Sequence, residues 1–157
     1  MDFEKVRSIK NSTRFKANAT GFYALRGESV EGFLENSQAQ SIVSFLEEVR
    51  KANKKYQAVV VVIDNFPSHR SELVKEKARE LNIYLVYLPS YSPDLNPIEQ
   101  IWRGIKRVIS LTFVEDLSKM EEVITDTWNE LSKGISYAKG WIKRFLEGKQ
   151  YYMDLCG

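Results

Sequence analysis

The first half of the chain shows patterns of apolar and polar residues that are typical of β-strands. An apolar and aromatic segment at 15–25 is followed by the turn signal Arg26-Gly27 and by an alternating segment at 28–33, which together predict a β-hairpin. Two further runs rich in apolar and β-branched residues predict buried strands at 58–63 and 83–88.

Helical periodicity separates and follows these strands. Apolar residues recur at three- and four-residue spacing in five segments: 37–53, 68–81, 96–111, 118–133 and 137–147. Ser37 is the expected N-cap of the first of these helices. The order of elements predicts an α/β fold, in which a mixed sheet of an antiparallel hairpin and parallel strands is covered by helices.

Composition indicates one globular domain. At 157 residues and 18.2 kDa, the chain is long enough for a single domain at 1–157 with its own hydrophobic core. No apolar run in the sequence approaches the ~20 residues that span a bilayer. The chain does not open on a signal-peptide pattern, so we expect a cytoplasmic protein without a membrane partner. The single Cys156 and the single His69 exclude a zinc-finger set.

The net charge of +2 is too small to indicate a nucleic-acid partner by itself, but the basic residues are clustered. Arg103, Lys106 and Arg107 recur at helical spacing, and a second cluster lies near the end of the chain: Lys139, Lys143, Arg144 and Lys149. A basic helix face beside an acidic site suits a phosphate backbone. A solvated face explains either cluster equally well.

Asp64 ends the buried run Val59–Ile63, so its carboxylate reaches the carboxyl edge of the sheet, where α/β proteins place their sites. A carboxylate at the end of a buried strand needs compensation, from backbone donors or from a metal ion. Asp64 and Asn65 are also good turn residues. The residues alone favour neither interpretation.

Glu99 follows a proline-rich turn and opens the predicted helix at 96–111. Asn96, Pro97 and Glu99 also make a good helix start, with Asn as N-cap, Pro first and Glu third. A capping box worth ~1 kcal/mol explains Glu99 without catalysis, and in isolation this is the stronger interpretation. If the carboxylates of Asp64 and Glu99 converge, they suggest a site for the hard divalent cation that phosphodiester chemistry usually requires.

Four other residues near these acids bear on the site. His69 is placed to hydrogen-bond a phosphate or to orient an acid, although a local structural contact is the commoner role for a histidine at a helix start. Tyr91 and Ser92 lie in the proline-rich turn, in reach of a substrate if the turn borders the site. Trp102 is expected to pack in the core.

Two segments carry a resemblance to a known family. The first is Val60-Val61-Val62-Ile63-Asp64-Asn65, with His69 five residues after the acid. The second is Leu88-Pro89-Ser90-Tyr91-Ser92-Pro93-Asp94-Leu95-Asn96-Pro97-Ile98-Glu99-Gln100-Ile101-Trp102. Both closely resemble the DDE transposases of the mariner-like insertion-sequence group, and the 34 residues between the two acids are a typical separation for that group. The resemblance covers roughly 15–109, and it favours a metal-binding role for Glu99 over the capping role.

The resemblance implies an RNase H-like fold on which Asp64 and Glu99 are the second and third acids of a metal-binding triad. It implies metal-dependent cleavage of DNA at transposon ends and transfer of the strand to a target, with Mg²⁺ or Mn²⁺ as cofactor. The implied partners are double-stranded DNA and a second copy of the chain, as a homodimer. The expected DNA-binding residues are His69, Arg103, Lys106 and Arg107.

The first acid of that triad has no clear counterpart. In this group it stands on a strand before the hairpin, whereas here only Asp2 and Glu4 precede the hairpin, and the segment 6–9 is too short and too charged to replace that strand. We therefore expect a sheet without its first strand, in an N-terminally shortened catalytic domain on which helices from 112–157 pack. Three origins would explain the missing first strand: a truncated remnant, a separately translated half, or a piece cut from a longer protein.

Two other functions fit the sequence. A non-catalytic remnant that binds DNA or dimerises would keep the fold and the basic helices but hold no metal pair. A flavodoxin-like domain with a small-molecule site is a weaker fit, because no glycine-rich phosphate loop follows any predicted strand. The leading hypothesis is a metal-dependent transposase domain, inactive alone if nothing replaces the first acid.

Overall fold

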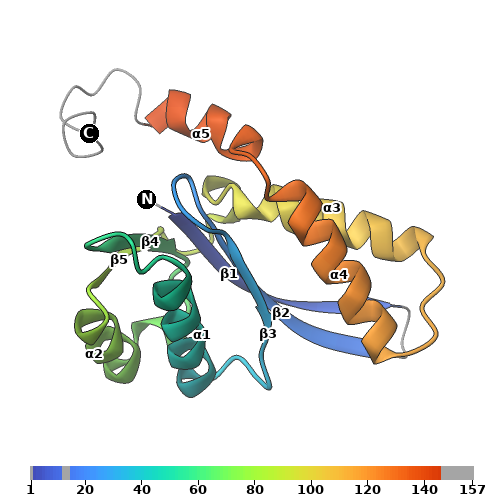
Figure 1. Ribbon diagram of the computed structural model, residues 1–157, viewed down its shortest axis with the longest axis horizontal. Helices are drawn as coiled ribbons and strands as arrows, with labels where there is room; N and C mark the ends of the chain where they lie inside the picture. The colour runs from blue at the N-terminus through green and yellow to red at the C-terminus, as the bar shows by residue number, and fades with distance from the viewer. Residues whose placement is uncertain (1, 12–14, 146–157) are drawn as a thin grey trace.

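The chain folds into a sheet with helices on both faces (Figure 1). The structure is a computed structural model that describes residues 2–11 and 15–145. For residues 2–8, 10, 11 and 145 it describes the backbone alone. The strands are β1 (Asp2–Asn11), β2 (Phe15–Tyr23), β3 (Val30–Phe33), β4 (Val59–Ile63) and β5 (Ile83–Tyr87). The α-helices are α1 (Ala39–Ala52), α2 (Glu72–Glu80), α3 (Ile98–Leu111), α4 (Leu117–Leu131) and α5 (Ser136–Phe145). Short 3-10 helices, η1 (Ser68–Arg70) and η2 (Pro93–Leu95), precede α2 and α3.

The five strands form one mixed sheet in the order β3-β2-β1-β4-β5. Antiparallel pairing joins β1 to β2 and β2 to β3, while β1, β4 and β5 run parallel. In the register of β1 with β4, Asp2 lies opposite Val61 and Glu4 lies opposite Ile63. The mixed α/β architecture and the hairpin of β2 and β3 are confirmed.

The expectation that the first strand is missing is wrong. β1 occupies the centre of the sheet, between β2 and β4. The prediction relied on the charges of this segment, whereas strand pairing is made by backbone groups that every non-proline residue supplies. Asp2 and Glu4, which were predicted to lie outside any strand, lie on the strand next to β4.

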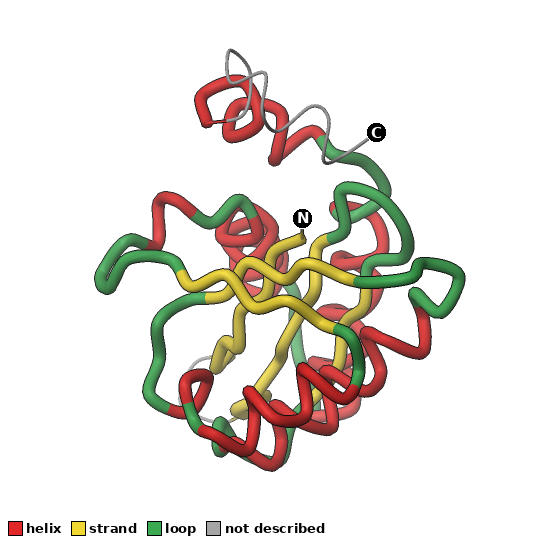
Figure 2. Tube along the Cα trace, turned by 90° about the vertical axis from the view of Figure 1, so that its left-hand side faces the viewer, coloured by secondary structure: helices red, strands yellow, loops and turns green. Residues whose placement is uncertain are grey.

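Two apolar clusters attach the helices to opposite faces of the sheet (Figure 2). Alternate residues of β4 point to opposite faces, so Val61 and Ile63 belong to one cluster and Val62 to the other. The first cluster contains residues of α1 and α2, and the second contains residues of α3, α4 and α5. Trp102, expected in the core, is 1% exposed and its ring lies 5.3 Å from that of Trp128 on α4.

Two helix starts differ from the predicted ones. α1 follows Gln38, which makes no side-chain cap, so Ser37 is not the N-cap. The predicted helix at 68–81 divides into η1 and α2, because Ser71 has an extended backbone and its side chain accepts a hydrogen bond from the Val74 amide at 3.3 Å. Serine is favoured at such positions because its oxygen satisfies an amide that the helix leaves without a partner.

Hydrogen bonds tie α4 and the start of α5 to the sheet. The hydroxyl of Thr125 on α4 donates to Glu31 on β3 at 2.8 Å, and the hydroxyl of Tyr23 on β2 donates to the carbonyl oxygen of Gly134 at 2.5 Å. The connection between α4 and α5 is therefore attached to β2. Among the described residues, none of the helices has the length and apolar character needed to cross a membrane.

Candidate metal and nucleic-acid site

Asp64 lies directly after β4, at the carboxyl end of that strand. One carboxylate oxygen, Oδ1, is 2.6 Å from Nδ1 of His69, and the main-chain oxygen of Asp64 is 3.2 Å from the same nitrogen. The Asp64 side chain is 18% exposed, so the carboxylate is sheltered but can be reached from solvent. With the proton assigned to Nδ1, His69 donates to the carboxylate and fixes its orientation.

His69 is held in place from several sides. It is 3% exposed, its carbonyl oxygen accepts a hydrogen bond from the Tyr87 hydroxyl at 2.9 Å, and the Phe66 ring lies 6.0 Å from the imidazole. Burial raises the pKa of Tyr87, which keeps this hydroxyl protonated as a donor. Of the roles predicted for His69, this geometry favours orienting an acid, while contact with a DNA phosphate stays a prediction.

The segment between β5 and α3 is fastened to the end of β4. The Leu88 amide donates to the carbonyl oxygen of Ile63 at 2.8 Å, and the side-chain amide of Asn65 donates to the Ser90 hydroxyl at 3.2 Å. Tyr91 has φ of 58°, a left-handed conformation that is strained for a bulky residue, and its side chain is fully exposed. Substrate contact by this turn stays a prediction.

Asn96 accepts two hydrogen bonds at the start of α3. Its Oδ1 accepts from the Ile98 amide at 3.4 Å, and its carbonyl oxygen accepts from the Glu99 amide at 3.1 Å. In a capping box Glu99 would accept from the Asn96 amide, but that amide donates to the carbonyl oxygen of Pro93 at 3.0 Å. The Asn96 amide therefore already has a backbone partner, and the metal-binding role of Glu99 stays a prediction. α3 begins at Ile98, so Pro97 rather than Asn96 is the N-cap position.

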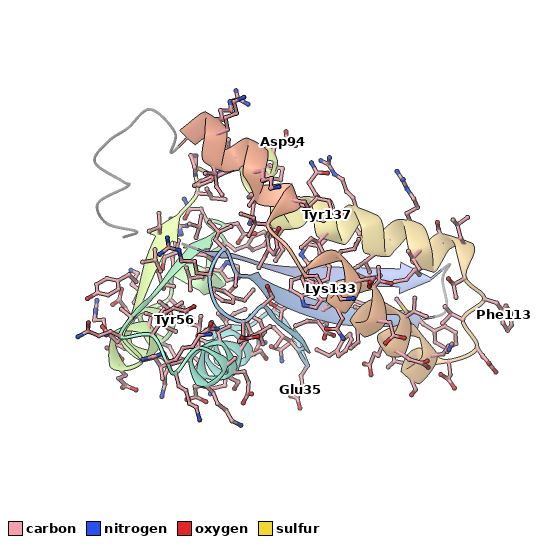
Figure 3. All side chains as sticks on the ribbon, turned by 45° about the horizontal axis from the view of Figure 1, so that its top comes forward. Glu35, Tyr56, Asp94, Phe113, Lys133 and Tyr137 are labelled. Atoms are coloured by element: carbon pink, nitrogen blue, oxygen red, sulfur yellow. The ribbon has the colours of Figure 1, made fainter. Side chains whose placement is uncertain are left out.

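Glu99 is 5% exposed and lines a cleft of about 280 Å³ between the start of α3 and α5. Figure 3 labels two residues of this cleft, Asp94 in η2 and Tyr137 at the start of α5. Other lining residues are charged, aromatic or small: Arg103, Gly140, Trp141 and Arg144. The cleft thus joins the predicted third acid to cationic and aromatic groups.

The predicted DNA-binding residues of α3 lie on its outer surface. Arg103, Lys106 and Arg107 are all exposed, and Arg103 forms an ion pair with Asp94 across 3.4 Å. Three residues of the second basic cluster are exposed on α5, namely Lys139, Lys143 and Arg144. The fourth, Lys149, lies outside the described residues. Contact of these side chains with phosphate stays a prediction.

The described residues do not bring three possible metal ligands together, because no group of three His, Cys, Asp or Glu among them is close enough to hold an ion. They do supply two carboxylates from two elements, Asp64 after β4 and Glu99 on α3. Oxygen donors are the ligands that Mg²⁺ and Mn²⁺ prefer. The chemistry of this donor pair therefore fits a hard cation.

The contribution of α5 to the cleft was not predicted from the sequence. Tyr137, Trp141 and Arg144 are spaced by four and three residues, which places them on one face of a helix. That spacing was available as a signal, but it is equally typical of core packing. Only the position of α5 beside α3 distinguishes the two.

Comparison with known proteins supports one family. A family model described as a DDE superfamily endonuclease matches residues 4–121. The Tcb2 transposase of Caenorhabditis briggsae is 32% identical over 79 residues, which is 50% of this chain and 29% of the relative. The Tc1 transposase of Caenorhabditis elegans is 43% identical over 44 residues, 28% of this chain and 16% of the relative. The matches therefore span less than a third of these relatives.

Solved structures show the same fold. The catalytic domain of the Mos1 mariner transposase superposes with a TM-score of 0.76 at 19% identity, over 90% of this chain and 75% of that chain. The catalytic core domain of BIV integrase gives a TM-score of 0.54 at 12% identity, over 79% and 81%. The RNase H-like fold expected from the sequence is confirmed.

Proposed function

The chain belongs to the family of DDE superfamily endonucleases, and from that premise we propose that it cuts DNA at transposon ends and transfers the cut strand to a target. The observation that carries this proposal is the placement of the two acids. Asp64 is oriented by His69 at the end of β4, and Glu99 is buried at the start of α3 in a cleft with basic residues. Transposase relatives and the mariner-like fold support the same function.

In this proposal Asp64 and Glu99 hold divalent cations, Mg²⁺ or Mn²⁺, through their carboxylate oxygens. When bound, the ions activate the attacking oxygen and stabilise the leaving one. His69 keeps the Asp64 carboxylate in one orientation, as hydrogen-bonded partners of metal ligands commonly do. The small exposure of Glu99 restricts its carboxylate to the cleft.

The reaction exchanges one phosphorus–oxygen bond for another in each of two steps. First, water attacks a phosphodiester at the transposon end, the bond to the 3′ oxygen breaks, and that oxygen takes up a proton as a 3′-hydroxyl. Second, this hydroxyl loses its proton and attacks a phosphodiester of the target, which releases a new 3′-hydroxyl. No oxidant or reductant is needed.

DNA is bound through its backbone in this proposal. Arg103, Lys106 and Arg107 are exposed along α3, which begins at the proposed site, so phosphates beside the reacting one come within their reach. His69 contributes at most one further contact, because it is almost covered. Two transposon ends are handled by a homodimer.

A non-catalytic DNA-binding or dimerisation role is the second candidate, and it rests on the incomplete ligand group in the described part of the chain. β1 bears on this alternative, because Asp2 and Glu4 lie on the strand next to β4 and Glu4 is in register with Ile63. One of these acids, or an acid from a second copy, is the proposed first ligand.

Nicking of supercoiled plasmid with Mg²⁺ or Mn²⁺ tests the proposal. We expect nicking by the unaltered protein only with metal, and none by Asp64→Asn or Glu99→Gln. Glu115→Gln, at an exposed position of the α3–α4 loop, is the matched control and should nick normally. Equal nicking by Asp64→Asn and the unaltered protein would refute the proposal. DNA binding without nicking by any variant would support the second candidate. If the unaltered protein nicks, loss of nicking in Asp2→Asn or in Glu4→Gln identifies the first acid.

A further inference from the structure

The cleft between α3 and α5 contains groups that strand cleavage does not require. Its α5 wall lies beyond residues 4–121, where the family model matches. Trp141 and Arg144 stand on that wall, and Arg103 stands on the α3 wall. Aromatic rings stack on nucleobases and guanidinium groups bind phosphates, so this combination is suited to a nucleotide.

Trp141 is anchored for such a role. Ala138 of α5 is completely buried, and Trp141 and Ile142 pack against the same apolar cluster that contains Trp102 and Trp128. Trp141 therefore contacts the core and also lines the cleft. A ring that is already fixed by packing loses little side-chain freedom when a base stacks on it, which favours binding.

Gly140 leaves open space on the α5 side of the cleft. It lies inside α5, where glycine is less favourable than alanine, and it lines the cleft beside Trp141. A Cβ atom built at Gly140 would meet nothing within 4 Å, so packing does not require glycine there. A larger side chain at Gly140 would therefore project into open space at the cleft.

The size of the cleft limits what it can hold. Its volume of about 280 Å³ is close to the lower limit of ~300 Å³ for small-ligand sites. One nucleotide is of that scale, whereas a base pair within a duplex is not. The cleft is therefore of a size that suits a single unpaired nucleotide better than a base pair.

We propose that this cleft binds one unpaired nucleotide of a DNA strand whose reacting phosphate lies at Glu99. The base stacks on Trp141, and the phosphate lies between Arg103 and Arg144. Asp94, which also lines the cleft, forms an exposed ion pair with Arg103 across 3.4 Å. This inference rests on the proposed function, because it takes the strand to Glu99.

Tryptophan fluorescence locates the bound nucleotide. The chain has three tryptophans, and Trp102 and Trp128 are almost fully buried. Quenching by a bound base therefore reports on Trp141. We expect a duplex with a 3′ overhang to quench the emission and a blunt duplex of the same sequence not to quench it. Equal quenching by free dAMP at the same concentration would assign the cleft to free nucleotides and overturn the strand-based inference.

Variants of α5 test the site itself, through the affinity for a labelled overhang duplex measured by anisotropy. Gly140→Leu fills the space without disrupting the helix, and Trp141→Ala removes the stacking ring; each should weaken binding about tenfold. Trp141→Phe, which keeps a ring, should bind nearly as well as the unaltered protein. Gly134→Leu is the matched control, because a Cβ there also meets nothing and Gly134 does not line the cleft.

The conditions of these binding measurements distinguish a failure of this inference from a failure of the proposed function. All binding is measured without metal and in the Asp64→Asn protein, which cannot cut if the proposed function is right. Loss of overhang binding in Gly140→Leu supports the nucleotide site even if no protein nicks plasmid. Unchanged binding by Gly140→Leu and Trp141→Ala, with helix content preserved by circular dichroism, overturns the site even if nicking depends on Asp64.

Discussion

Gly21 on β2 lies against two indole rings that are tilted at 34° to each other, and a methyl group there should force the rings to move. An ideal Cβ at Gly21 would lie 2.5 Å from Cη2 and 2.6 Å from Cζ3 of Trp128, and 3.0 Å from Cζ2 of Trp102. Both rings are almost fully buried, and their centroids are 5.3 Å apart. The substitution Gly21→Ala therefore acts on rigid groups that have no open space beside them.

The size of the effect follows from the required movement. The Trp128 ring must retreat by roughly 1 Å to restore ordinary contact in an interior packed as densely as an organic crystal. Overpacking of this kind costs about 1–3 kcal/mol. For a domain of this size, a loss of about 2 kcal/mol lowers Tm by roughly 4–8 °C. Because Trp102 follows Glu99 by one helical turn, the strain should also lower metal-dependent nicking.

Urea unfolding followed by circular dichroism measures this loss. Gly32→Ala is the matched control on the neighbouring strand β3, because its Cβ would lie 3.6 Å from Phe45, an ordinary contact. That control should be neutral or stabilised by about 0.4–1 kcal/mol. Trp128→Phe removes the ring atoms that clash. The Gly21→Ala, Trp128→Phe double variant should therefore lose less free energy of unfolding than the sum of the losses in the two single variants.

Two results would refute this reasoning. If Gly21→Ala and Gly32→Ala have the same free energy of unfolding, the indole rings yield without cost and the packing argument fails. If the effects of Gly21→Ala and Trp128→Phe simply add, the destabilisation arises elsewhere than at the contact between these residues.

Three further predictions concern charge and the site. Burial raises the pKa of Glu31 above its ordinary value of 4.5, so the contribution of this carboxyl to stability is complete below that pH and is lost as the pH rises through the folded-state pKa. Glu31→Gln should therefore raise Tm at pH 7 more than at pH 4, and a larger gain at the lower pH would contradict the assignment. His69→Ala should reduce metal-dependent nicking ~10–100-fold by releasing Asp64, with full activity as the adverse result. Arg103→Ala with Lys106→Ala should lower the salt slope of DNA binding by roughly 1.8, since each lost phosphate contact removes ~0.9; an unchanged slope would exclude both residues.

Local patterns predicted most of the elements because one physical rule dominates each of them. The β-branched run before Asp64 has no competing interpretation as a surface helix, and β4 ends where the run ends. Asn96 and Pro97 mark the start of α3 to within one residue, because they act within one turn. Ser37 failed as a cap because an N-cap needs its side chain at the helix end, and α1 begins later.

Long-range placement could not be predicted in the same way. β1 carries charged residues at the centre of the sheet, and its place depends on pairing with β2 and β4 rather than on its own composition. The burial of Glu99 beside α5 depended on a helix that lies about forty residues further along the chain. The position of Trp141, packed on the core and lining the cleft, depended on the packing of α5 beside α3.

The contact between His69 and Asp64 has a practical consequence, because this histidine is the only one in the chain. The imidazole signals in a nuclear magnetic resonance spectrum therefore belong to one known ring, and no assignment experiments are needed. Any cation that binds the Asp64 carboxylate changes the hydrogen bond at Nδ1 of His69 and shifts those signals. Occupancy of the site can thus be followed by titration in the unaltered protein, without DNA and without turnover.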